Sequence, residues 1–121
     1  MQTVAWVIYL FCVVNGGRCL YVEDARVTEY SPEMGGLNCD GTCEHTAFMT
    51  PVTYGLTAAC GPGIPFGTRV YIERVGWRTC QDRGGLIEDD EVDVAVRARE
   101  YQKLGIDGRR PVVWLLMGPT D

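Results

Sequence analysis

The chain has 121 residues, of which 46% are hydrophobic, and this predicts a single globular domain with one modest core. Its 16 Asp and Glu residues outnumber its 11 Lys and Arg residues, which gives a formal net charge of −5. Because binding to phosphates requires a basic surface, this charge excludes nucleic acid as an expected partner.

An apolar run occupies Thr3 to Val14 and is followed by the small residues Gly16 and Gly17. The run is too short to cross a membrane comfortably and is typical of the hydrophobic part of a signal peptide. We therefore expect residues 1–20 to be a signal peptide and residues 21–121 to form the domain of a secreted or cell-envelope protein. Such a domain would not associate with a membrane once the signal is removed. The alternative is that the run forms a buried first strand of a domain that keeps its N-terminus.

The rest of the chain consists mainly of strand patterns. Alternating or continuously apolar runs predict strands over residues 20–27, with 25–29 continuing this first strand, and over 53–59, 68–75, 77–81, 92–96 and 112–117. A stretch rich in turn-forming residues, 30–50, follows the first of them. Apolar residues spaced three to four apart over 96–104 predict one short helix that ends before Gly105. This order predicts a mainly β protein, a small six-stranded barrel with one short helix.

Two carboxylates stand in unusual surroundings in the second half of the chain. Asp93 lies between two valines, where a charged group is costly unless it has partners or a function. Asp82 lies just before Gly84 and Gly85, where the backbone can approach a ligand closely. Together the two carboxylates predict a general acid/base pair at a strand end. The structural alternative is that Asp82 caps the glycine turn and that Asp93 pairs with Arg83.

Three ordered blocks of sequence contain these carboxylates. They are Ile64-Pro65-Phe66-Gly67-Thr68-Arg69-Val70-Tyr71-Ile72, Gln81-Asp82-Arg83-Gly84-Gly85-Leu86-Ile87 and Val92-Asp93-Val94. In their order and spacing, the blocks resemble the 3D domain, a family named for three aspartates and found in bacterial cell-wall lytic enzymes and their phage counterparts. The resemblance covers the chain from about Tyr30 to Leu116, and it implies a small double-psi β-barrel.

The resemblance also implies an activity on the glycan strands of peptidoglycan. In a lytic transglycosylase, one carboxyl group protonates the glycosidic oxygen and then takes a proton from the sugar's own hydroxyl, so a single catalytic carboxylate suffices. We expect Asp93 to be this acid/base, with Asp82 orienting Asp93 or the sugar, and we expect no cofactor and no metal. Substrate contacts are expected from residues near the loops that border the groove and from the glycine turn: Tyr30, Thr46, Tyr54, Gly84 and Gly85.

One position departs from the family pattern. The family's first Asp precedes the Ile-Pro pair by a few residues, and Cys60 stands there in this chain. The alternative function is therefore a non-catalytic glycan-binding or structural module on the same barrel, associated with a phage particle or a cell-surface assembly. A third interpretation is a disulfide-rich interaction protein without a sugar ligand.

The six cysteines indicate an oxidising compartment. Removal of the signal peptide would leave four of them, an even set for two disulfides. The resemblance places Cys60 and Cys80 on neighbouring strands, and we expect the disulfides Cys60–Cys80 and Cys39–Cys43. The alternative is a zinc site made by Cys39, Cys43, His45 and one of the other two cysteines.

Overall fold

The computed structural model describes residues 9–13, 18–34 and 45–116, with their side chains from residue 20 onward. Its seven strands are β1 (Tyr9–Val13), β2 (Arg18–Tyr30), β3 (Thr57–Cys60), β4 (Arg69–Ile72), β5 (Gly76–Arg83), β6 (Glu91–Ala95) and β7 (Gly108–Leu116). Two single turns of 3₁₀ helix, η1 (Pro32–Met34) and η2 (Ala98–Glu100), lie beyond the ends of β2 and β6.

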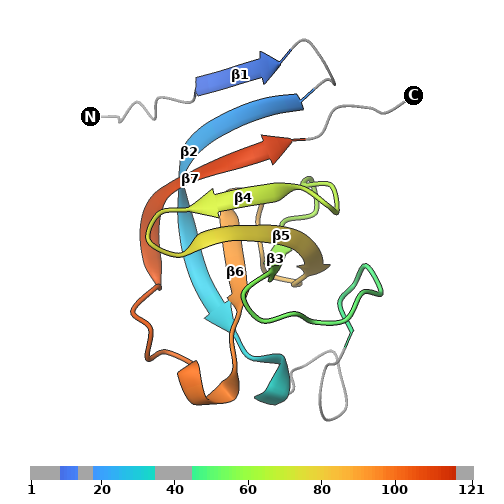
Figure 1. The fold of residues 1–121 in the computed structure, drawn as a ribbon, viewed down its shortest axis with the longest axis vertical. Helices are drawn as coiled ribbons and strands as arrows, with labels where there is room; N and C mark the ends of the chain where they lie inside the picture. The colour runs from blue at the N-terminus through green and yellow to red at the C-terminus, as the bar shows by residue number, and fades with distance from the viewer. Residues whose placement is uncertain (1–8, 14–17, 35–44, 117–121) are drawn as a thin grey trace.

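Six of the strands close into a barrel (Figure 1). Around the ring they follow the order β2, β6, β3, β5, β4 and β7, and β7 pairs back onto β2. The pairs β2–β6 and β3–β5 are parallel, and the other four are antiparallel. The expected class, a mainly β, six-stranded barrel, is therefore confirmed.

The long strand β2 makes this closure possible. It has 13 residues, of which residues 19–27 pair with β7 along one edge, while the other edge is shared between β1 at residues 18–22 and β6 at residues 26–30. The sequence pattern had predicted residues 20–27 as this strand, with residues 25–29 continuing it. Residues 28–30 at the end of β2 lie beside β6 and bring β2 to the Asp93 position.

The core lies inside the ring, where alternate residues of each strand point inward. Its fully buried members include Val27, Val70, Ile72, Val92, Val94, Val112 and Trp114. Cys60 and Cys80 also lie in this core and form a disulfide between β3 and β5, so this predicted disulfide is confirmed. Because most of the inward residues are apolar, polar residues that alternate with them, such as Thr28 on β2 and Asp93 on β6, are placed on the outer face.

The helix expected over residues 96–104 is much shorter in the structure, where only the single turn η2 forms. Two backbone donors of the segment bind β2 instead of the carbonyls of a helix. The Val96 N–H donates to the Tyr30 carbonyl, and the Gln102 N–H donates to the Glu29 carboxylate. A nine-residue helix is marginal by itself, so these tertiary bonds outweigh the apolar spacing. Gly105, expected to end the helix, has a positive φ of 66° but ends a series of turns.

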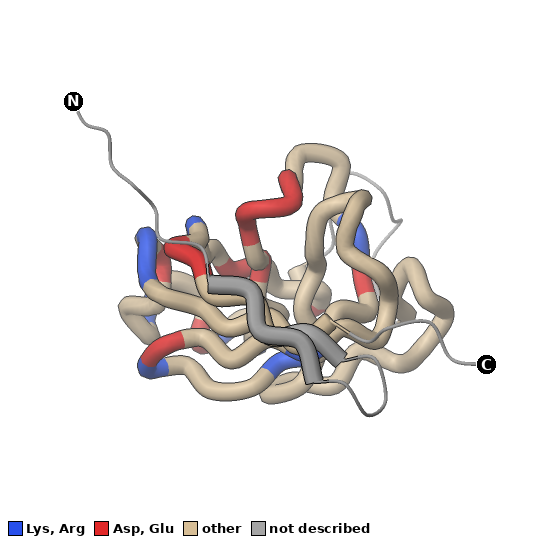
Figure 2. The backbone as a smooth tube through the Cα atoms, turned by 90° about the horizontal axis from the view of Figure 1, so that it is seen from above, with Lys and Arg blue, Asp and Glu red and all other residues tan. Residues whose placement is uncertain are grey.

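The N-terminal apolar run contributes β1, which pairs antiparallel with the start of β2. Removal of residues 1–20 as a signal peptide stays a prediction. Among the described segments, no helix has the length and apolar character needed to cross a membrane. Figure 2 shows acidic and basic positions interspersed around the barrel, without one side reserved for either sign.

Candidate functional site

Asp93 and Asp82 lie in one row across the outer face of the barrel. Asp93 on β6 is directly opposite Ala59 on β3, and Ala59 is directly opposite Asp82 on β5. On its other side Asp93 is opposite Thr28 on β2. Residues opposite each other in paired strands point to the same face, so the row runs Thr28, Asp93, Ala59, Asp82. Two strand spacings, or about 10 Å of backbone, separate the two Asp residues.

Asp93 is the residue of this row whose environment favours the protonated form. Burial raises the pKa of the Asp93 carboxyl to about 6, against the lowering effect of a hydrogen bond from Thr28. The negative charges of Asp107, Asp82 and Glu91 raise this pKa further. The Thr28 hydroxyl donates to Asp93 Oδ1 over 2.8 Å. Asp93 can therefore carry a proton at mildly acidic pH while one hydrogen bond fixes its orientation.

Asp82 is held by three donors. The backbone N–H groups of Ala47 and Arg83 donate to its Oδ1 over 2.8 and 2.9 Å, and the Tyr30 hydroxyl donates to its Oδ2 over 2.9 Å. It does not bind the glycine turn that was the structural alternative. These bonds tie β5 to the end of β2 and to the 46–50 turn, so Asp82 is suited to positioning its neighbours.

Arg83 does not pair with Asp93, contrary to the other structural alternative. Its guanidinium donates to the Ile64 carbonyl and lies 3.9 Å from the centre of the Phe66 ring. With Arg83 engaged elsewhere, Asp93 has no basic partner among the hydrogen bonds and ion pairs of the described residues. This agrees with the raised pKa of its carboxyl.

A cavity of about 350 Å³ opens beside the Thr28 end of the row. It is lined by Arg26, Val27, Thr28, Asp107, Gly108 and Arg109. Two of the lining residues affect Asp93 directly, because Thr28 donates to its carboxylate and Asp107 is the largest of the charges that raise its pKa. Asp93 itself does not line the cavity, so a molecule there would act on the acid through Thr28 and Asp107.

The expected substrate-contacting residues are not all in one place. Tyr30 spans the outer face to reach Asp82, since β6 and β3 lie between its strand and β5. Thr46 is only 3% exposed, and its hydroxyl shares a 2.7 Å hydrogen bond with that of Thr50. The Tyr54 ring packs under the Arg97 guanidinium at 4.6 Å.

Gly84 and Gly85 lie at the opposite end of the row from the cavity beside Thr28. With Pro62, Arg83 and Ile87 they line a hollow of about 500 Å³. A side chain at position 84 would come within 2.7 Å of Ile87, which explains the glycine there by packing. Position 85 has open space, and its glycine leaves the hollow accessible.

The predicted disulfide Cys39–Cys43 lies outside the described residues. The zinc alternative loses its fourth ligand, because Cys60 and Cys80 are bonded to each other and have no thiolate to offer. Within the described residues, no group of three or more His, Cys, Asp or Glu side chains is placed to hold a metal ion.

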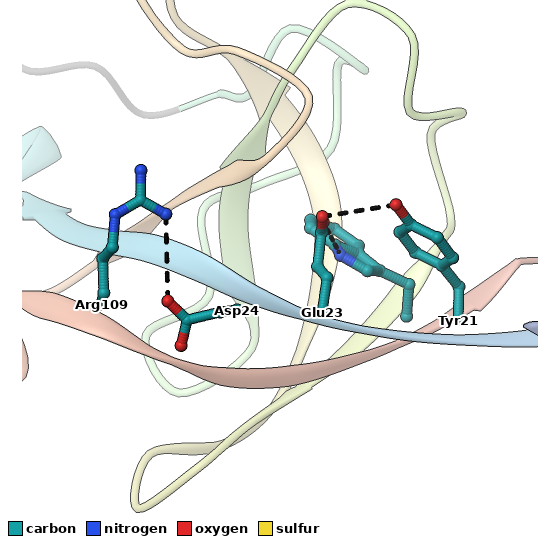
Figure 3. Close-up of polar contacts among 5 residues, drawn as sticks. Tyr21, Glu23, Asp24 and Arg109 are labelled. Atoms are coloured by element: carbon teal, nitrogen blue, oxygen red, sulfur yellow. Dashed lines mark hydrogen bonds and ion pairs between the residues drawn. The ribbon is translucent and has the colours of Figure 1, made fainter. Parts of the chain in front are cut away.

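A partly buried carboxylate, Glu23, lies on β2 away from this row. Glu23 accepts a 3.4 Å hydrogen bond from the Tyr21 hydroxyl (Figure 3) and a 2.7 Å hydrogen bond from the indole nitrogen of Trp114. Burial raises the pKa of Glu23, although both hydrogen bonds oppose the increase. Its partner Trp114 is a core residue with a polar group to satisfy, so Glu23 has a structural reason for its position.

Sequence reasoning missed Thr28, Arg26, Asp107 and Arg109. Thr28 and Arg26 lie within the predicted strand and alternate with the inward residues Ala25 and Val27, and this alternation could have marked them as outward-facing. Asp107 and Arg109 reach the same place only through the β2–β7 pairing, which no local pattern indicates. No protein-family model, curated protein or solved structure matches this chain.

Proposed function

We propose that the protein cleaves the glycan strands of peptidoglycan, with Asp93 as the general acid and base. The observation that carries the proposal is a carboxyl group with a pKa of about 6, held by a hydrogen bond from Thr28, a residue that lines a cavity. The resemblance of the three sequence blocks to the 3D domain supplies the substrate class. A secreted, cell-envelope or virion-associated location follows from the same resemblance.

The reaction needs two proton transfers, one from Asp93 and one back to it. Asp93 would donate its proton to the glycosidic oxygen as the bond to the anomeric carbon breaks. A hydroxyl of the same sugar would then attack that carbon and return its proton to Asp93, so the product is an anhydro sugar and no water is consumed. Asp82 would keep Tyr30 and the 46–50 turn in place, and its charge helps Asp93 to retain the proton.

A non-catalytic glycan-binding or structural module on the same barrel is the second candidate. Two observations favour it. Cys60 occupies the place of the family's first Asp and is consumed in a disulfide, and the Asp82 carboxylate already accepts hydrogen bonds from three donors, Ala47, Arg83 and Tyr30. Such a module would use the same row to bind sugar and would leave the strand intact.

Mass spectrometry of digested glycan strands separates these candidates. The protein, incubated with purified cell-wall glycan near pH 5, should release fragments that end in an anhydro sugar. Fragments with ordinary reducing ends would indicate hydrolysis instead, which needs a positioned water. Retention of the protein on intact strands without any fragment would support the binding module and contradict the catalytic proposal.

A further inference from the structure

Cys12 on β1 and Cys19 on β2 lie directly opposite each other in the antiparallel pair of these strands. The register is uninterrupted over the whole of β1. Directly opposite residues of antiparallel strands have Cα atoms about 4.5 or about 5.5 Å apart, and a disulfide requires about 4.4–6.8 Å. The backbone of β1 and β2 therefore already meets the distance requirement of a Cys12–Cys19 disulfide.

The other four cysteines of the chain are accounted for without these two. Cys60 and Cys80 are joined in the core, and Cys39 and Cys43 are the second pair expected from the sequence. The cysteines of β1 and β2 remain, and the strand register brings them together. A compartment that oxidises the pair in the core also oxidises other neighbouring thiols, so the same conditions favour a third disulfide.

The residues around this pair have the composition of a strand that belongs to the sheet. At residues 19–22, β2 lies between β1 and β7, and apolar residues occupy matching register positions on all three strands. The two apolar rows are Tyr9–Val22–Val113 and Phe11–Leu20–Leu115. Apolar residues directly opposite each other favour strand pairing, so this continuity favours β1 as a permanent strand of the domain.

The start of the chain lacks one feature of a signal peptide. Such a peptide ordinarily begins with a positively charged segment before its apolar run. In this chain the first basic residue is Arg18, which follows the run and lies on β2. The alternative interpretation of the run, a first strand that the domain keeps, agrees with both the charge pattern and the strand pairing.

We propose that a disulfide between Cys12 and Cys19 fastens β1 to β2 and keeps this N-terminal strand in the mature protein. The inference concerns the covalent structure of the chain and does not rest on the proposed function. Because the two cysteines are only 19 − 12 = 7 positions apart, the bond closes a short hairpin. It holds a five-residue edge strand, which pairs only with β2 among the described residues, against the rest of the sheet.

Formation of the bond is a thiol–disulfide exchange. One cysteine thiolate attacks the disulfide of an oxidant, either glutathione disulfide or a protein oxidoreductase, and one thiol of the oxidant leaves. The second thiolate then attacks the mixed disulfide and releases the other thiol of the oxidant. In all, the two cysteines lose two electrons and two protons, and the disulfide of the oxidant gains them.

Peptide mapping of the full chain, refolded with glutathione and glutathione disulfide, tests the inference. Trypsin cuts after Arg18 and next after Arg26, so it places the two cysteines on separate peptides, 1–18 and 19–26. Without reduction, mass spectrometry should detect these peptides joined as one species, and reduction should divide it into both. Alkylation of either cysteine before reduction, or a bond from either one to any other cysteine, would overturn the inference.

The length of the mature protein is the second test. The protein recovered from a bacterial host that expresses the full chain should have an intact mass that includes residues 9–19. A protein that begins after Cys19 would overturn the inference and support the signal peptide instead. The proposed function would stand in either case, because Asp82 and Asp93 lie on β5 and β6.

Hydrogen exchange measures whether the bond holds β1 in place. In the variant Cys12→Ser/Cys19→Ser, the amides of β1 should exchange at least about tenfold faster than in the wild type, because a cross-link no longer opposes local opening. The amides of β6 are the internal control and should exchange at an unchanged rate. A mild reductant should speed exchange of β1 in the wild type and have no effect in the variant. Equal exchange of β1 in the oxidised wild type and the variant would overturn the inference.

Discussion

Replacing Asp93 by Asn should lower the rate of glycan cleavage by about 10²–10⁴-fold, the usual cost of losing a general acid or base. Asn has the shape of Asp and can still accept the hydrogen bond from Thr28, but it has no proton to donate. The rate is measured by release of anhydro-ended fragments. Asp90→Asn is the control, since it removes a nearby negative charge from an exposed position outside the row. Full activity in Asp93→Asn would remove this residue from the mechanism.

The same variant should be more stable than the wild type at neutral pH. The pKa of Asp93 is raised from 3.8 to about 6 in the folded protein, so the folded state binds the proton more tightly than the unfolded chain. This contribution to stability is complete below pH 3.8 and is lost as the pH rises through 6. We expect Asp93→Asn to gain about 2 kcal/mol relative to the wild type between pH 4 and pH 7.5 in urea unfolding. The gain also verifies that any loss of cleavage is not a loss of fold.

Removing the Cys60–Cys80 disulfide should have the largest effect on stability. The bond closes a loop with a sequence separation of 20 and lies entirely within the core. In the chain-entropy model such a cross-link is worth roughly 3 kcal/mol, so the double variant Cys60→Ala/Cys80→Ala should unfold at a much lower urea concentration. Activity should fall as well, because Cys60 adjoins Ala59 and the bond ties together the two strands that carry Ala59 and Asp82.

Thiol labelling checks this prediction independently. The unfolded, unreduced protein should show no reaction at Cys60 or Cys80, and reduction should expose both. The wild type with reduced cysteines should then match the double variant in stability. Free thiols at these positions in the untreated protein, or a double variant as stable as the wild type, would disprove a structural role for the bond.

The class of fold could be predicted because most strands show an alternating or apolar pattern in their own sequence. Val92 and Val94 are apolar on either side of Asp93, and this alternation is what places the valines in the core and Asp93 on the outer face. The prediction of a helix over 96–104 was wrong because it rested on a local pattern. The hydrogen bonds that Val96 and Gln102 donate to β2 join segments far apart in the sequence.

The candidate site could be predicted only in part, since it is assembled by strand pairing. Asp82 and Asp93 were found from their surroundings in the sequence, but their common row depends on Ala59, a residue without any functional signal. Thr28 and Arg109 join the row and its cavity through contacts between β2, β6 and β7. Thr28 and Asp93 are 65 residues apart in the sequence, so a local pattern cannot indicate their contact.

The central claim is that Asp93, held by Thr28, keeps a proton up to about pH 6, and titration of its side-chain carboxyl by carbon-13 NMR tests this most directly. The Asp93 carboxyl resonance is identified as the one that is missing from the spectrum of Asp93→Asn. The structure predicts a midpoint of about 6, well above the ordinary 3.8 of an Asp carboxyl. A midpoint at or below that ordinary value would mean that Asp93 is ionised under all relevant conditions, and it would contradict Asp93 as the acid.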